Sequence, residues 1–281
     1  MVAYALAAVA AMARRGDIAP ESGAISHARV PLLGKRSGSS LGSLVRPALT
    51  TRLADWLLWS GSLLGAGAWT LRSVSSGHVA LAGLYDVLLG LAVLMAPLAW
   101  VARRLAGRTP AWFDPLAGAV LLVPVGFVMD PVSQPMPAVL DSPLFIPHVG
   151  AYLLGYVLLL KAAAVGATAV AMPANRADLA ERVAYRLSGL AIGLLTADLV
   201  LGAAWGQRAW GDWWNWDPKE LWSLATWLMV AMYLHVRSLG PGIRRRVAPA
   251  VLAGSAVLAV VTLVWVNLSP RFAGLHSYAA N

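Results

Sequence analysis

The chain has 281 residues, of which 59% are hydrophobic and 12% are charged, and its mean hydropathy is +0.66. Soluble domains contain roughly 45–50% apolar and 25% charged residues, so this composition excludes an ordinary soluble domain. The sequence contains no cysteine, which excludes disulfides, thiolate metal ligands and cysteine nucleophiles. Any soft-ligand chemistry is therefore left to the five histidines.

Apolar runs follow one another along most of the chain. Seven of them reach about 20 residues, enough at ~1.5 Å per residue to cross ~30 Å of hydrocarbon. An eighth run, residues 2–13, is shorter and is interpreted as the end of a span that begins upstream. We therefore predict an all-α polytopic membrane bundle of about eight transmembrane helices, the first short or truncated, in a single domain, residues 1–281. The longer runs are 53–71, 78–101, 111–129, 148–171, 187–205, 218–236 and 247–268.

Lysine and arginine gather in alternate loops, and this pattern predicts the orientation of the chain. There are 22 Lys+Arg against 13 Asp+Glu, a net charge of +9. Basic loops of membrane proteins stay on the cytoplasmic side. We therefore place the linker 14–52, rich in glycine, serine and arginine, and the loops near 103–108, 176–186 and 237–246 in the cytoplasm. Because topology accounts for the charge, no nucleic-acid partner is predicted.

Tryptophan is concentrated in one segment, residues 205–227, which holds seven of the thirteen tryptophans. An interfacial aromatic belt is the simplest explanation of tryptophans near a membrane surface, but a belt needs only one or two per span. Part of the segment is a polar connection that is predicted to face outward and suits a flat, apolar, π-rich ligand. Its tryptophans are Trp210, Trp213, Trp214 and Trp216.

The helix after this connection has a clear start. Asp217 is expected at the N-cap, Pro218 at the first helical position and Glu220 three residues after the cap, an acidic version of the capping box. Both acids thus have a structural role, and a direct ligand role for Asp217 stays as the alternative. Because the cap sets where the helix begins, it also sets the position of the preceding tryptophans at the membrane surface.

Two histidines are predicted on the same outer side as the tryptophans. His148 begins one span and His276 follows the last span. Two neutral imidazoles flanking an aromatic surface would form a bis-histidine iron site for haem, whereas the simpler alternative is a pair of solvated loop histidines. His235 lies about 15 residues, or ~22 Å, further along its helix and cannot share that site. It is either an intramembrane functional group or an interfacial histidine.

Two acids fall within predicted spans, Asp86 and Asp198. An unpaired carboxylate costs a few kcal/mol in a bilayer. Both side chains are therefore expected to face the bundle interior and to find a hydroxyl, an arginine or water.

Three segments resemble one known family. Residues 205–227, WGQRAWGDWWNWDPKELWSLATW, followed by Tyr-Leu-His-Val-Arg at 233–237, closely resemble the tryptophan-rich WWD domain of the CcsA (ResC) family. CcmC and CcmF are relatives of that family. Val-Asn at 266–267 with Gly-Leu-His-Ser-Tyr-Ala at 274–279 resembles its last outer loop, and Pro-His-Val at 147–149 resembles its earlier histidine site. One departure is Asp86, which stands where the family has glutamate.

The resemblance implies a haem-handling subunit of a system II cytochrome c synthase, or haem lyase, in the bacterial plasma membrane. Such a subunit works with a ResB-type membrane protein and brings haem b to an extracytoplasmic WWD surface. There the haem is joined to the Cys-x-x-Cys-His motif of apocytochrome c. By this likeness His148 and His276 match the outer axial ligands, and His235 matches an intramembrane haem ligand whose partner ResB would supply. Arg208 and Arg271 are candidates for pairing with the haem propionates.

Two other functions stay open on the sequence. A permease of another ligand would carry an ion-coupled cavity around Asp86 and Asp198, with the tryptophans as anchors. A non-catalytic scaffold would only hold the ResB partner.

Overall fold

The computed structural model describes residues 3, 41–107, 109–133, 135–265 and 274–276. These residues form an all-helical structure in which no strand is found. The predicted short run 2–13, except Ala3, lies outside the described residues. The helices are α2 (Leu41–Ser76), α3 (Leu84–Leu105), α4 (Phe113–Phe127), α5 (Phe145–Val170), α6 (Ala174–Trp210), α7 (Pro218–Val236) and α8 (Pro241–Val260), with a 3-10 turn η1 (Ala138–Leu140) and a π-helical turn η2 (Val261–Trp265).

Each long apolar run of the sequence coincides with a helix, but fewer helices qualify as spans than predicted. Four described helical segments are long and apolar enough to cross a membrane, namely Leu84–Leu105, Phe145–Val170, Arg176–Trp210 and Gly242–Val264. Helix α4 has only 15 residues, or about 22 Å. Helix α2 begins at Leu41 rather than near 53, so the last part of the expected linker 14–52 is helical. The structure thus supports a helical membrane protein without the count of about eight spans.

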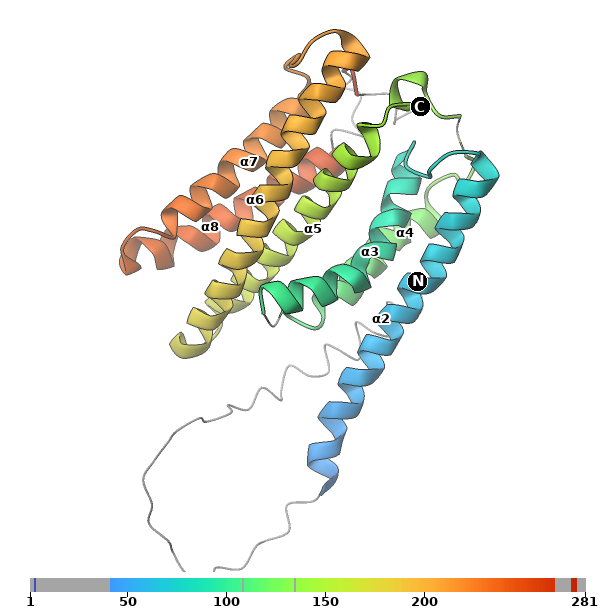
Figure 1. Ribbon diagram of the computed structural model, residues 1–281. Helices are drawn as coiled ribbons and strands as arrows, with labels where there is room; N and C mark the ends of the chain where they lie inside the picture. The colour runs from blue at the N-terminus through green and yellow to red at the C-terminus, as the bar shows by residue number, and fades with distance from the viewer. Residues whose placement is uncertain (1–2, 4–40, 108, 134, 266–273, 277–281) are drawn as a thin grey trace, which may run out of the picture.

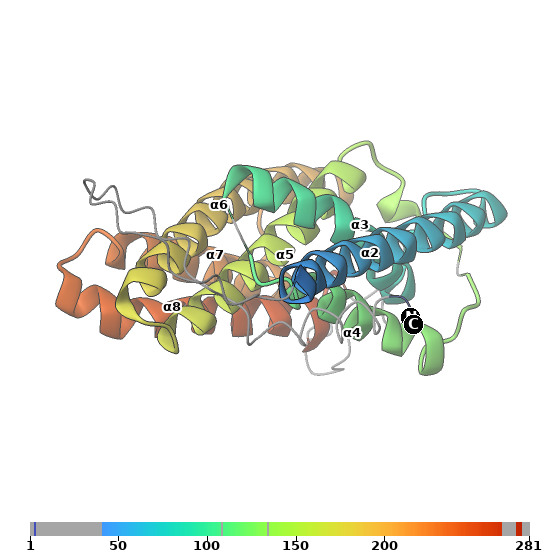
Figure 2. The same cartoon turned by 90° about the horizontal axis from the view of Figure 1, so that it is seen from below.

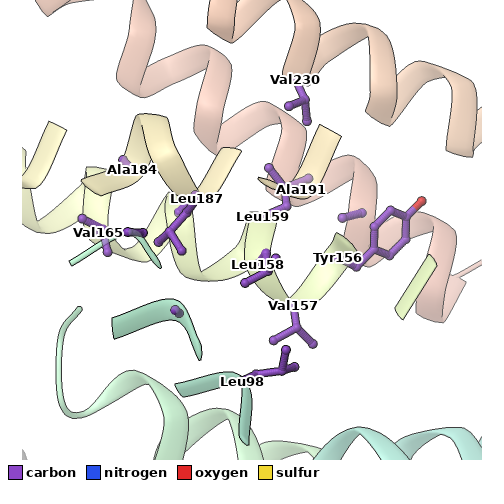
Figure 3. Close-up of a cluster of buried hydrophobic side chains, with 14 of the residues drawn as sticks. Leu98, Tyr156, Val157, Leu158, Leu159, Val165, Ala184, Leu187, Ala191 and Val230 are labelled. Atoms are coloured by element: carbon purple, nitrogen blue, oxygen red, sulfur yellow. The ribbon is translucent and has the colours of Figure 1, made fainter. Parts of the chain in front are cut away.

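The helices form two groups (Figure 1). Helices α5 to α8 pack on one another, whereas α2 and α4 pack on α3. The view from below in Figure 2 shows the same division. Leucine, valine and alanine, with two tyrosines and one methionine, fill the largest buried cluster, which centres on α5 and reaches α3, α6, α7 and α8; Figure 3 shows part of it.

A buried ion pair links the two groups. Lys161 of α5 contacts Asp114 of α4, and neither residue has more than 4% of its surface exposed. A buried charge without a partner is costly, so the pair favours this arrangement of α4 against α5. The sequence analysis did not single out either residue.

The connections between helices divide between the two ends of the bundle. The α3–α4, α5–α6 and α7–α8 connections lie at one end, and the α6–α7 connection lies at the other (Figure 1). The first end carries the basic clusters 103–104, 176–186 and 237–246. The second end carries the tryptophan connection, which starts where α6 stops at Gly211, a residue with φ 89° whose N–H bonds to the Gln207 carbonyl at 3.1 Å. A left-handed residue at this position ends the helix at low cost only if it is glycine.

Candidate functional site

A cavity opens at the end of the bundle that carries the tryptophan connection. Its walls come from α3, α5, α6 and α7, from the segment before α3 and from the residues after α8. The space in the cavity and its open mouth together is about 1000 Å³. The lining is mostly apolar, and its main polar residues are His148, Tyr152, Asp198, Lys219, Glu220, Ser223 and His276.

His148 is held in the first turn of α5 by Asp198 of α6. Its Nδ1 lies 2.9 Å from Asp198 Oδ1 and 3.1 Å from the Asp198 carbonyl oxygen. A carbonyl oxygen only accepts hydrogen bonds, so Nδ1 carries a proton, and in the neutral imidazole the lone pair is on Nε2. Metal-binding histidines commonly have this arrangement, because a carboxylate or carbonyl on one ring nitrogen orients the other toward the metal. Asp198 is only 2% exposed, so the expectation that it faces the interior is confirmed, with histidine as its partner.

The second histidine is fixed by the start of α7. His276 Nδ1 lies 2.9 Å from Asp217 Oδ1, and Lys219 Nζ donates to the His276 carbonyl at 3.3 Å. Asp217 Oδ1 also accepts from the Lys219 N–H at 2.9 Å, while Glu220 accepts from the Asp217 N–H at 3.1 Å. The predicted capping box is therefore confirmed. Asp217 holds a histidine in the same orientation as Asp198 does, in addition to its role at the cap.

One tryptophan contacts both histidines. The Trp205 ring lies 5.8 Å from the His148 ring, nearly parallel to it, and 5.7 Å from the His276 ring, measured between centroids. Trp205 is 1% exposed, and its indole N–H donates to the Val139 carbonyl at 3.2 Å. Trp210 packs edge-on against both Trp205 and His276, at 4.8 and 4.7 Å. Trp205 thus contacts both imidazoles, and Trp210 contacts that of His276.

The other predicted aromatic residues are divided between the cavity and the surface. Trp214 lines the cavity and packs edge-on against Trp216 at 6.0 Å. Trp213 and Trp216 are 62% and 66% exposed and do not line it. Trp216 has φ 56°, a left-handed conformation that is rare for a bulky residue and marks a strained turn directly before the cap. Trp214 thus lies in the cavity wall, Trp210 packs against His276, and Trp213 and Trp216 are exposed; a ligand surface formed by all four stays a prediction.

Two predicted site residues lie away from the cavity. Arg208 is exposed in the last turn of α6 and does not line it. His235 is exposed near the far end of α7, which agrees with the expectation that it cannot share a site with His148 and His276. Arg271 lies outside the described residues.

The sequence analysis did not connect three residues on one face of α6 with the histidine site. Asp198, Gly202 and Trp205 follow a spacing of four and three residues, which places their side chains on the same side of a helix. A Cβ at Gly202 would lie 2.8 Å from His148 Cε1, so the glycine makes room for the imidazole. The spacing of an acid, a glycine and a tryptophan was the available signal.

Burial sets the protonation of the His276–Asp217 pair. Burial lowers the pKa of His276, although Asp217 opposes this effect, so the imidazole is neutral at pH 7. Burial alone would raise the pKa of Asp217, but the hydrogen bond from His276 and those from the Lys219 and Leu275 N–H groups lower it overall. The pair is therefore a neutral imidazole that donates to a carboxylate.

We expect acid to release His276 from α7. The pKa of His276 is lower in the docked state than the usual 6.5, so the undocked state gains a proton first and docking weakens as the pH falls below 6.5. Docking also lowers the pKa of Asp217, so docking weakens further as the pH falls below the usual carboxyl pKa of 3.8. Above pH 6.5 docking should be constant. Proteolysis of the segment after α8 as a function of pH measures it.

The variant His276→Asn provides the control for this pH dependence. Asparagine keeps an N–H donor for Asp217 but does not titrate, so the change between pH 6.5 and 3.8 should disappear, whereas the contribution of Asp217 below 3.8 stays. An unchanged profile in this variant would contradict the assignment.

Comparison with known proteins identifies the family. The family described as cytochrome C assembly protein matches residues 57–276, most of the chain. Several proteins named cytochrome c biogenesis protein CcsA are similar to part of this chain. The one from Crocosphaera subtropica is 47% identical over 105 residues, which are 37% of this chain and 30% of that protein. The one from Synechocystis sp. is 44% identical over 102 residues, which are 36% of this chain and 30% of that protein. The one from Gloeobacter violaceus is 42% identical over 123 residues, which are 43% of this chain and 35% of that protein.

These alignments span about a third of the length of the CcsA relatives. The family match, in contrast, includes both cavity histidines and the whole tryptophan segment. The predicted likeness to CcsA is confirmed, and the chain belongs to the cytochrome c assembly protein family.

Proposed function

We propose that this chain is the haem-handling subunit of a cytochrome c synthase, which presents haem b for covalent attachment to apocytochrome c. Membership of the cytochrome c assembly family supports a role in cytochrome c maturation. One observation carries the finer proposal: two imidazoles, each with Nδ1 within 2.9 Å of a carboxylate oxygen, line one cavity and contact the same indole.

The cavity residues fit haem as a substrate. Haem iron has four porphyrin nitrogens and accepts two axial ligands, which His148 and His276 would supply through Nε2. The apolar walls and the adjoining tryptophans suit the flat macrocycle. Gly202 leaves the space that the His148 ring occupies.

The reaction needs positioning more than acid–base catalysis by this chain. Each client thiol S–H adds across one haem vinyl C=C, so a C–S bond and a C–H bond form and no oxidant is consumed. The residues of the cavity bind and orient the haem, which converts a bimolecular reaction into one between held groups.

The proposal includes an orientation and partners. Positive loops lie at the end opposite the cavity, which supports an extracytoplasmic cavity in a bacterial plasma membrane. About eight spans would then include α2, α4, α7 and the run 2–13. A ResB-type protein would supply the partner of the exposed His235, which we propose as an intramembrane haem ligand. Trp213 and Trp216 would contact the haem edge or the apocytochrome.

The permease alternative predicted one cavity around two acids. In the structure Asp198 lines the cavity with His148, whereas Asp86 is buried in a separate pair with Arg72. Asp86 thus has the interior position and the arginine partner that were expected, but the two acids do not share a cavity.

The scaffold alternative is tested by co-expression with ResB and an apocytochrome, because only a synthase yields covalent haem on the client.

Single histidine substitutions test the haem site. Purified chain should show the spectrum of b-type haem with two imidazole ligands. His148→Ala and His276→Ala should each abolish the six-coordinate signal of the outer site, since each removes one axial ligand. His78→Ala is the matched control, because His78 does not line the cavity. Chain that stays colourless when made in haem-replete cells, or equal effects of all three substitutions, would refute the proposal.

A further inference from the structure

A second cavity lies at the opposite end of the bundle. It is formed by the end of α5, the start of α6, the end of α7 and the start of α8. The cavity and its mouth enclose about 880 Å³. Small apolar residues, among them Gly166, Ala177, Ala184 and Ala248, form most of its wall. The charged residues that line it are Glu181, Arg237 and Arg245.

Among the described residues, the charges at this cavity do not balance. Glu181 pairs with Arg237 and lies 3.6 Å from Arg244, and Arg245 lies 4.0 Å from Asp178. Three arginines face two carboxylates, which leaves one positive charge. The Nε atoms of Arg237 and Arg244 are buried and make no hydrogen bond within the part of the chain that the structure describes. Buried donors of this kind call for an acceptor.

This cavity is distinct from the environment of His235. Tyr233 and Arg237 line the cavity and are one helical turn apart. His235 lies between them in sequence, which places it on the other side of α7, and it is exposed. The cavity therefore belongs neither to His235 nor to the pair His148 and His276.

We propose that this cavity binds the headgroup of an anionic phospholipid, with the glycerol and upper acyl chain against its apolar wall. A phosphodiester carries one negative charge, which matches the excess, and guanidinium groups bind phosphate through paired hydrogen bonds. Basic pockets between helices on the cytoplasmic side are suited to such headgroups. The segments that form the cavity hold several of the basic residues of the chain, Arg176, Arg182, Arg186 and Arg246 among them.

Other anions fit these residues less well. Inorganic phosphate has no apolar part, so it would make no contact with the apolar wall of the cavity. Haem brings two propionates, and no histidine is among the residues that line this cavity. The proposal is independent of the haem function proposed above, because it uses none of the same residues as ligands.

The test compares lipids with the same acyl chains but different headgroups. Full-length chain in detergent is titrated with dioleoylphosphatidylglycerol or dioleoylphosphatidylcholine, and binding is measured by native mass spectrometry and by the shift in thermal unfolding. Phosphatidylglycerol should bind in a one-to-one complex and raise the unfolding temperature, and phosphatidylcholine should not. Arg245→Gln should weaken binding about fivefold, which is the effect expected for one basic residue.

Two further variants separate this site from general charge attraction. Arg246→Gln removes the neighbouring exposed charge, which does not line the cavity, and should leave binding unchanged. Ala177→Leu places a larger side chain in the cavity next to its apolar wall. It should weaken lipid binding while every charge is kept.

Four results would overturn the proposal. These are equal binding of the two lipids, equal effects of Arg245→Gln and Arg246→Gln, an equal thermal shift with inorganic phosphate alone, or displacement of phosphatidylglycerol by equimolar haem b. The last would identify a haem site instead.

Discussion

Substitution of Gly202 by alanine should weaken haem binding by displacing the His148 ring. The new Cβ would lie 2.8 Å from Cε1 and 3.1 Å from Nδ1 of His148, closer than atoms pack. The imidazole must therefore turn away from Asp198, which holds it at 2.9 Å. Loss of the group that orients a metal-binding histidine costs about 10–100-fold in affinity, and we expect a loss of this size. Titration of the purified variant with haem b measures it.

The same helix provides the matched control. A Cβ at Gly193 would meet nothing within 4 Å, and Gly193 is exposed. Gly193→Ala should stabilise α6 by roughly 0.5–1 kcal/mol, because alanine loses less backbone entropy than glycine. Its haem affinity should equal that of the unmodified chain. Equal haem affinity for Gly202→Ala would show that His148 does not bind haem in the observed position.

Substitution of Gly274 by alanine should separate the segment that carries His276 from α7. A Cβ there would lie 2.1 Å from Asp217 Oδ2 and 3.0 Å from Cδ of Pro218. The Asp217 carboxylate is fixed by the cap and by His276, so residues 274–276 must move instead. We expect the six-coordinate haem signal to fall as far as in His276→Ala, although the histidine is still present. The measurement is the absorption spectrum of the reduced protein.

Leu275→Ala is the control for this effect. Leu275 is 41% exposed, and its backbone N–H to Asp217 is unaffected by a change of side chain. The variant should keep the spectrum. A normal spectrum in Gly274→Ala would mean that the contact between Gly274 and Asp217 is not needed to place His276.

Several features of this protein were determined by local sequence. The start of α7 was predicted to the residue, because the cap, the proline and the glutamate act within one helical turn. The helical class and the approximate place of each apolar helix followed from hydropathy, since the hydrocarbon core requires long apolar runs. The family followed from the tryptophan segment and the spacing of its histidine and arginine sequel.

Other features depend on contacts between residues far apart in the chain, which single-sequence periodicity does not encode. The pairing of His148 with Asp198 joins residues 50 positions apart, and that of His276 with Asp217 joins residues 59 apart. The sequence analysis gave equal weight to four tryptophans of the connection, but tertiary packing brought buried Trp205 into contact with both histidines and left Trp213 and Trp216 exposed.

The sequence by itself determined that this chain is a helical membrane protein of the cytochrome c assembly family with two histidines near a tryptophan-rich connection. Only the tertiary structure decided which carboxylate lies beside each histidine, which indole contacts both, and that a second, arginine-lined cavity exists at the other end. The physical reason is range: hydropathy and capping act within a few residues, whereas a site is built where separate helices approach within hydrogen-bonding distance.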